Sequence, residues 1–247
     1  MLDEALLSRH PVHAPFLSMA QTDHLDAPAG LSLTRVESMP FGENTYVVHK
    51  AGDRRCLVID PGFEPDAVIA AIEEAGLEPA AILLTHGHSD HIAGNAALRK
   101  VWPGLPIVIG HRDAPKLQDP KANLSAPFGF LIKSPPADQL VAEGETLDLA
   151  GLKLAVHEIP GHSIGHVVFR VLESTPPVVF AGDVLFREGI GRTDFPDGSF
   201  DALASGILAT LYSLPDDTLV FPGHGGPTTI GHERLHNPFV PDPRAAR

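Results

Sequence analysis

Three histidines and an aspartate stand close together in one short segment, THGHSDH at residues 85–91. In an extended chain alternate side chains point the same way, so we expect His86 and His88 to project together. Asp90 and His91 follow where the chain turns toward a helix, and they can reach the same space from another direction. Imidazole and carboxylate groups bind zinc, iron or manganese, so the spacing predicts a metal site more than a histidine-rich surface loop.

Three further donors each follow an apolar run and stand beside a glycine. They are His162 in IPGHS, Asp183 in FAGDV and His224 in FPGHG. Glycine lets the backbone bend tightly and approach an ion closely. A single histidine after a strand is more often an ordinary residue, but four strand-end positions in one chain indicate a convergent site.

The segments that carry these donors alternate between short strands and helices. Short apolar runs bounded by Gly, Pro or Asp predict strands at 45–50, 55–60, 80–84, 106–110, 152–159, 166–172, 177–183 and 218–223. Apolar spacing predicts helices over 65–76, 91–102 and 200–214. Pro65 suits the start of the first helix and Gly76 its end, and Asp197, Gly198 or Ser199 could cap the third. Both halves of the chain show this alternation, which predicts an α/β (α+β) chain in which two sheets pack face to face with helices outside.

The two ends of the chain differ in character. Residues 1–30 are rich in Pro, His and Asp without a clean period, so we expect an N-terminal extension followed by one domain over 31–247. Residues 119–137 carry four prolines and form a long connection, which is expected to be functional or flexible. Asn123 and the segment 128–130 lie in it, where they could cover a substrate.

Composition limits the partners. The 31 Asp and Glu against 18 Lys and Arg give a net charge of -13, which repels phosphate backbones and disfavours nucleic acid. No segment approaches the roughly 18 apolar residues of a membrane span, and the first residues do not follow the signal-peptide pattern. Cys56 is the only cysteine, so no intramolecular disulfide can form, which suits a protein of the cytoplasm. We expect Cys56 itself to lie in the core.

The order THxHxDH, PGH, GD and PGH resembles the metallo-β-lactamase fold superfamily over about residues 31–240. Within it, GDVLFREGIGRTDFPDGS and PGHGGPTTIGHERLHNPF are similar to the hydroxyacylglutathione hydrolases, or glyoxalase II-like proteins, of the short bacterial type that lacks the C-terminal helical domain. The resemblance implies a four-layer αββα sandwich, in agreement with the two predicted sheets. It also implies two divalent metal ions, with zinc favoured and iron or manganese as other occupants.

The resemblance further implies a role for each donor. One ion would be held by His86, His88 and His162 and the second by Asp90, His91 and His224, with Asp183 bridging both. A hydroxide between the ions would attack a small-molecule thioester such as S-lactoylglutathione, an activity that belongs to methylglyoxal detoxification. Asp90 is also a candidate to orient that water or to accept its proton.

Residues beside the donors have expected roles of their own. Thr85 is expected to fix the loop by hydrogen bonding, and Asp60 in VIDPG either orients a ligating imidazole or serves the turn. Arg192 in GRTDF is a candidate substrate contact, with an internal salt bridge as the alternative. His166 is expected to be structural, and the histidines expected to be ordinary are His10, His13, His24, His111, His157, His232 and His236.

Other functions remain open. Full-length glyoxalase II proteins bind glutathione through basic residues and a tyrosine of a C-terminal domain, whereas 23 residues follow His224 here, so the thiol is undecided. The main alternative is a persulfide dioxygenase, a family that shares the GRTDF stretch, with one iron held by His86, His162 and Asp183. The PGHGGPTTIGHER tail favours the hydrolase. The acidic balance disfavours phosphodiester cleavage. The sequence leaves open β-lactam hydrolysis as a side activity and a metal-binding module without catalysis. It also leaves the oligomeric state undecided.

Overall fold

In the part of the chain that the computed structural model describes, residues 20–244, the N-terminal half forms a seven-stranded sheet. Its strands lie side by side in chain order. The pairs from β1 to β4 are antiparallel, and β5, β6 and β7 each run parallel to the strand before. The strands are β1 (Gln21–Leu25), β2 (Leu31–Ser38), β3 (Glu43–Lys50), β4 (Arg55–Ile59), β5 (Glu78–Leu84), β6 (Ile107–Gly110) and β7 (Gln139–Val141).

The C-terminal half of the described residues forms a six-stranded sheet in the order β15-β14-β11-β10-β9-β8. The central strands β11 and β14 are parallel, and the other pairs are antiparallel. A small hairpin, β12 (Leu185–Phe186) and β13 (Gly189–Ile190), follows β11. The sheet strands are β8 (Thr146–Leu149), β9 (Leu152–Glu158), β10 (Val167–Val171), β11 (Val178–Gly182), β14 (Leu219–Pro222) and β15 (Thr228–Thr229).

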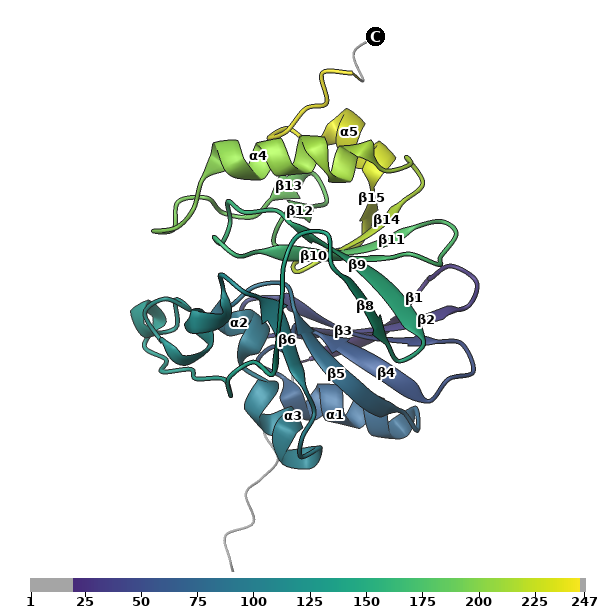
Figure 1. Ribbon diagram of the computed structural model, residues 1–247, viewed down its shortest axis with the longest axis vertical. Helices are drawn as coiled ribbons and strands as arrows, with labels where there is room; N and C mark the ends of the chain where they lie inside the picture. Colours follow the sequence, from purple (N-terminus) through teal and green to yellow (C-terminus); the bar gives the residue numbers. More distant parts are fainter. Residues whose placement is uncertain (1–19, 245–247) are drawn as a thin grey trace, which may run out of the picture.

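Helices cover the outer face of each sheet (Figure 1). Helices α1 (Pro65–Glu74) and α3 (Asn95–Val101) lie outside the first sheet, and α4 (Phe200–Ala209) and α5 (Ile230–His236) lie outside the second. The layers therefore run helix, sheet, sheet, helix, and the predicted αββα sandwich is confirmed. Shorter turns connect them: α2 (Ser89–Ile92), η1 (Ala114–Gln118), η2 (Ala126–Phe128) and η3 (Leu211–Ser213).

Three apolar cores hold the four layers together. The core between the sheets contains Phe169, Phe180 and Phe221. A second core packs the first sheet against α1 and α3 and includes Cys56, which is buried as predicted. The third packs the second sheet against α4 and α5, with Leu203 among its residues. Burial of both faces explains why most of the central strands read as continuous apolar runs.

The extension expected over residues 1–30 joins the first sheet from residue 21 onward. Gln21–Leu25 forms the edge strand β1, which pairs with β2 along its whole length. All five side chains of this strand are exposed or half-buried, and its sequence QTDHL lacks the apolar pattern by which a strand is recognised. Residues 1–19, with His10 and His13, lie outside the described residues.

Two of the predicted helices differ from the structure. The helix predicted over 91–102 is divided into α2 and α3, because Gly94 packs on the turn after β4. Its N–H donates to the Pro61 carbonyl at 2.8 Å, and a Cβ on it would lie 2.9 Å from the Gly62 carbonyl oxygen. The helix predicted over 200–214 ends at Ala209, and its predicted cap Ser199 accepts a hydrogen bond from the N–H of Ala202. Among the described residues, no helix is both long enough and apolar enough to cross a membrane.

Candidate metal centre

Loops from both sheets meet at one edge of the sandwich. The N–H of Val167, at the start of β10, donates to the carbonyl of Thr85, at the end of β5, at 2.8 Å. The N–H of Gly223 donates to the carbonyl of Gly182 at 2.8 Å, which joins the ends of β14 and β11. A Cβ on Gly223 would collide with Asp183, so only glycine permits this approach. The donors that follow β5, β11 and β14 are thus brought together.

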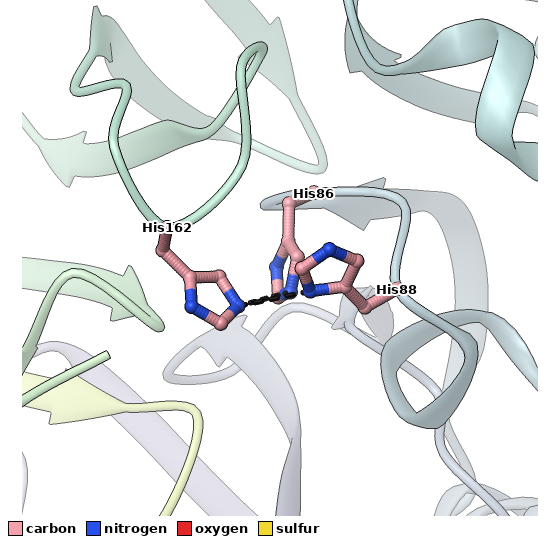
Figure 2. Close-up of side chains that lie close together, drawn as sticks. All are labelled: His86, His88 and His162. Atoms are coloured by element: carbon pink, nitrogen blue, oxygen red, sulfur yellow. Dashed lines mark hydrogen bonds between the residues drawn. The ribbon is translucent and has the colours of Figure 1, made fainter. Parts of the chain in front are cut away.

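His86, His88 and His162 form the first group of candidate ligands (Figure 2). The Nε2 atom of His162 lies 2.9 Å from Nδ1 of His88 and 3.2 Å from Nε2 of His86. All three side chains are buried, and they point toward one another from two loops. Three imidazoles that face one small space are the donor set of a divalent transition metal.

Asp90, His91 and His224 form the second group, on α2 and after β14. The Nε2 atom of His224 lies 3.5 Å from Oδ2 of Asp90, and Nε2 of His91 lies 3.9 Å from the same oxygen. The Nδ1 atom of His224 faces the carbonyl of Phe41 at 3.2 Å, so its Nε2 is directed at the group.

Asp183 lies between the two groups. Its Oδ2 is 3.4 Å from Nε2 of His162 in the first group and 3.4 Å from Nε2 of His224 in the second. Its Oδ1 is 3.4 Å from Nε2 of His91. One carboxylate therefore reaches imidazoles of both groups, and all seven donors expected from the sequence are brought together.

The donors fit divalent metal ions. Among the described residues, Nε2 of His91 and Oδ1 of Asp183 lie 3.4 Å apart between the donors, are buried and make no hydrogen bond. A buried polar atom without a partner costs about 1–3 kcal/mol, which metal coordination would recover. Burial lowers the pKa of His86, His88 and His162, so these imidazoles are neutral at pH 7, the form that binds metal.

The imidazoles of His91 and His224 and the carboxylates of Asp90 and Asp183 carry opposite charges that stabilise one another. Burial opposes the charged form of His224, but Asp183 and Asp90 raise its pKa to about 11. The same two carboxylates raise the pKa of His91 well above its usual range against the effect of burial. Burial also opposes the charged form of Asp183, but His224, His91 and His162 hold its pKa well below the usual range. The centre therefore keeps an ionised carboxylate in its interior.

Asp60, which directly follows β4, contacts Thr85 and the candidate ligand His91 and so orients them. It accepts hydrogen bonds from the backbone N–H of Thr85 at 2.7 Å and from the Thr85 hydroxyl at 2.6 Å. Its Oδ2 lies 3.1 Å from Nδ1 of His91, which leaves Nε2 of that ring for the centre. Of the two roles that the sequence leaves open for Asp60, the contacts favour orientation of an imidazole.

Asp113 and Lys116 form a buried ionic network that was missed in the sequence. Asp113 accepts hydrogen bonds from the N–H of Gly87 and the N–H of Gly165, each at 2.8 Å, and from the Ser163 hydroxyl. Lys116 donates to Ser163 and, at 2.6 Å, to Asp197. These contacts join the loops that carry the first group, and no local pattern around η1 indicates them.

Glu43 is the second residue that was missed. It is fully buried at the start of β3, and its Oε1 lies 4.0 Å from Nδ1 of His91. Burial raises the pKa of this carboxyl well above its usual range, which favours the neutral acid. An acidic residue beside the apolar run of β3 is the signal that could have identified it.

The other histidines lie around or away from the centre. His166 stacks on His86 with ring centroids 4.8 Å apart and accepts a hydrogen bond from the N–H of Asp183 at 3.0 Å. It is a structural neighbour of the ligands, as the sequence indicates. The histidines that contact other partners outside the two groups are His24, His49, His111, His157, His232 and His236.

A cavity of about 230 Å³ opens beside the donors. Arg192 lines it, but its guanidinium donates to Asp194 at 2.9 and 2.7 Å, so the predicted alternative, an internal salt bridge, is present. Phe128 of the long connection also lines the cavity. Asn123 is buried and holds that connection in place by bonds to the carbonyls of Lys116 and Ile132.

A sequence relative carries an enzyme name. Hydroxyacylglutathione hydrolase GloC of Haemophilus influenzae is 38% identical over 194 residues, which cover 76% of this chain and 88% of GloC.

Solved structures share the fold across most of the chain. The BLEG-1 B3 metallo-beta-lactamase has a TM-score of 0.80 and 36% identity, covering 84% of this chain and 99% of that one. TTHA1623, in a di-iron-bound form, has a TM-score of 0.73 and 39% identity, covering 83% and 99%. ETHE1 from Myxococcus xanthus has a TM-score of 0.67 and 27% identity, covering 89% and 84%.

The family model matches the region that holds the whole centre. The model of the Metallo-beta-lactamase superfamily matches residues 39–224, from the end of β2 to the last candidate ligand. The αββα layers and the His/Asp metal-binding cluster agree with that match. The chain belongs to the metallo-beta-lactamase superfamily.

Proposed function

We propose that this chain is a metal-dependent hydrolase that cleaves small-molecule thioesters, with two divalent ions held by the seven donors. The observation that carries the proposal is the position of Asp183, whose oxygens lie 3.4 Å from imidazole nitrogens of both ligand groups. A carboxylate that reaches both groups suits a pair of ions better than a single one. The similarity to GloC supports hydrolysis of a thioester.

Metal ligands and cavity residues have different roles in the proposed reaction. Bound divalent ions supply a nucleophile from water at neutral pH and polarise the carbonyl group that is attacked. Burial opposes the charged form of Asp90, but His91 and His224 lower its pKa, so it is a carboxylate at neutral pH. Because it also lines the cavity, Asp90 is placed to orient the water or to accept its proton.

Among the described residues outside the candidate metal ligands, the cavity wall offers no proton donor for a leaving group, which suits a thioester better than an amide. A thiolate leaves without protonation, whereas an amine needs a general acid. Apart from the candidate metal ligands, the polar lining residues are Ser89 and Arg192, and Arg192 is paired with Asp194. Neither is suited to donate a proton to a leaving amine.

The alternative proposal is a persulfide dioxygenase with one iron. The similarity to ETHE1 favours it, and His86, His162 and Asp183 lie close enough to form its three-residue site. The second ligand group argues against it, because Asp90, His91 and His224 place their donor atoms within 4.8 Å of one another. A mononuclear enzyme would not need this second set.

Elemental analysis combined with two assays separates these proposals. The purified protein is loaded with zinc, iron or manganese, and its metal content per chain is measured. Release of thiol from S-lactoylglutathione and uptake of oxygen with glutathione persulfide are followed in parallel. Two ions per chain with thiol release supports the hydrolase, and one iron per chain with oxygen uptake contradicts it.

A further inference from the structure

The cavity beside the candidate ligands has an apolar wall. Six of its lining residues are hydrophobic: Phe41, Leu124, Phe128, Phe186, Ile190 and Phe195. The ring of Phe195 lies 5.3 Å from that of His88 and 5.6 Å from that of His162, centroid to centroid, so the apolar wall reaches the metal ligands. An acyl group whose carbonyl stands at the centre would lie against these rings.

The apolar wall continues out of the cavity as a row of aromatic rings. Phe128 packs edge-on against Phe41 at 5.5 Å, Phe41 against Phe63 at 5.6 Å, and Phe63 against Phe130 at 5.6 Å. Although packed in this row, Phe128 remains 54% exposed and Phe130 40%. Apolar surface that stays open to solvent beside a site marks a place for an apolar ligand group.

The cavity offers little to an anionic group. Arg192 is the lining residue with a permanent positive charge, and it is bound to Asp194 through two nitrogens while its guanidinium lies 4.5 Å from the ring centre of Phe195. Lys116 is buried and engaged by Asp197 and Ser163. A thiol carrier with two free carboxylates, such as glutathione, therefore finds no unengaged cation among the described lining residues.

The cavity is large enough for an aromatic acyl group. A cavity of about 150 Å³ can hold benzene, and this one measures about 230 Å³. A flat ring between phenylalanines gains edge-to-face or offset stacking in addition to burial. A methyl-sized acyl group would leave most of this apolar surface in contact with water.

We propose that the site selects thioesters with an aromatic or bulky hydrocarbon acyl group, held on the Phe41, Phe128 and Phe195 wall, and does not depend on an anionic thiol carrier. This inference rests on the proposed thioester hydrolase. The reaction consumes one water, breaks the bond between the acyl carbon and sulfur, and releases a carboxylate and a thiol. It needs no oxidant or reductant.

Paired substrates test the acyl group and the thiol separately. S-mandeloylglutathione differs from S-lactoylglutathione by a phenyl ring in place of a methyl group. We expect its kcat/KM to be at least about tenfold higher. The lactoyl thioester of N-acetylcysteamine, which has no carboxylate, is expected to be cleaved at least as efficiently as S-lactoylglutathione.

Two matched variants locate the preference. Phe128→Ala is expected to reduce the mandeloyl-to-lactoyl ratio of kcat/KM by roughly 2–10-fold, mainly through KM for the aromatic substrate. Phe239→Ala is the control, because Phe239 is also 54% exposed but is not part of the cavity wall. It is expected to leave the ratio unchanged.

The outcomes separate this inference from the function on which it rests. Equal or better cleavage of the lactoyl substrate, or an unchanged ratio in Phe128→Ala, overturns the aromatic selection while thioester hydrolysis stands. A preference of more than about tenfold for the glutathione carrier overturns the second half of the proposal. Failure to cleave every one of these thioesters in the metal-loaded protein contradicts the proposed function itself.

Discussion

Oδ2 of Asp113 accepts a hydrogen bond from the backbone N–H of Gly87 at 2.8 Å, in the middle of the ligand segment 85–91. The other oxygen of the same carboxylate accepts from the N–H of Gly165 at 2.8 Å, three residues after His162. A single buried side chain thus fixes the distance between two loops that come from different sheets. The geometry of the first ligand group depends on that distance.

Replacing Asp113 with asparagine is expected to weaken metal binding. An amide offers one acceptor oxygen for two N–H groups, so one of them is left without a partner at a cost of about 1–3 kcal/mol in stability. Movement of either loop separates the imidazoles, and metal affinity should fall by roughly 10–100-fold. Competition with a chelator measures the affinity, and thermal unfolding measures the stability.

The control for this variant is Asp217→Asn, which changes an exposed aspartate and should alter neither property. An Asp113→Asn protein with wild-type metal affinity would show that the backbone alone positions the two loops.

Asp183→Asn and His88→Ala are expected to abolish most of the turnover while the fold persists. Both side chains are candidate ligands, so each loss should reduce kcat/KM by more than about 100-fold, the upper effect of residues that only support ligands. Asp183→Asn should also reduce the metal content, because its oxygens reach both groups. Elemental analysis and circular dichroism are the measurements.

His111→Ala is the matched control for these two variants, since His111 lies on the surface beside Glu158. Wild-type rates in Asp183→Asn or His88→Ala would exclude the proposed centre.

Asp60 and Thr85 are expected to act as one unit. Asp60→Ala removes the acceptor that faces Nδ1 of His91, and Thr85→Val removes the hydroxyl that donates to Asp60. Each change should weaken metal binding, with Asp60→Ala the stronger. The double variant should lose little beyond Asp60→Ala, because residues in one hydrogen-bond network are not additive. A fully additive result would separate the two roles.

Cys56 is expected to be unreactive in the native protein. Burial raises the pKa of its thiol to about 12, so the reactive thiolate stays scarce up to about pH 10. Labelling by iodoacetamide should be slow and should rise only as the protein opens, whereas one thiol per chain reacts in guanidinium chloride. Cys56→Ala should keep its turnover, since the proposed chemistry uses no cysteine nucleophile; loss of turnover in a folded, metal-loaded variant would contradict this.

Local pattern determined a large part of the fold. Strands such as β5 and β11 are short apolar runs closed by Gly, Asp or Thr, and α1 begins at Pro65 and is followed by Gly76 in the left-handed region. These signals depend on neighbours in the chain, so they can be read without coordinates. The edge strand β1 and the break at Gly94 depend on pairing and packing with distant segments, and they were missed.

The features of the candidate centre also fall into those that the sequence predicted and those that it did not. The sequence by itself determined which residue types could bind metal and that the segments carrying them come after strands, because those properties are local. The family resemblance, and no local spacing, implied that Asp183 lies between the two groups. Only the tertiary structure decided that Asp60 faces His91 and that Asp113 joins the first-group loops. The reason is physical: His86 and His162 are separated by 76 positions, and their 3.2 Å approach is set by the packing of two sheets, which no local spacing encodes.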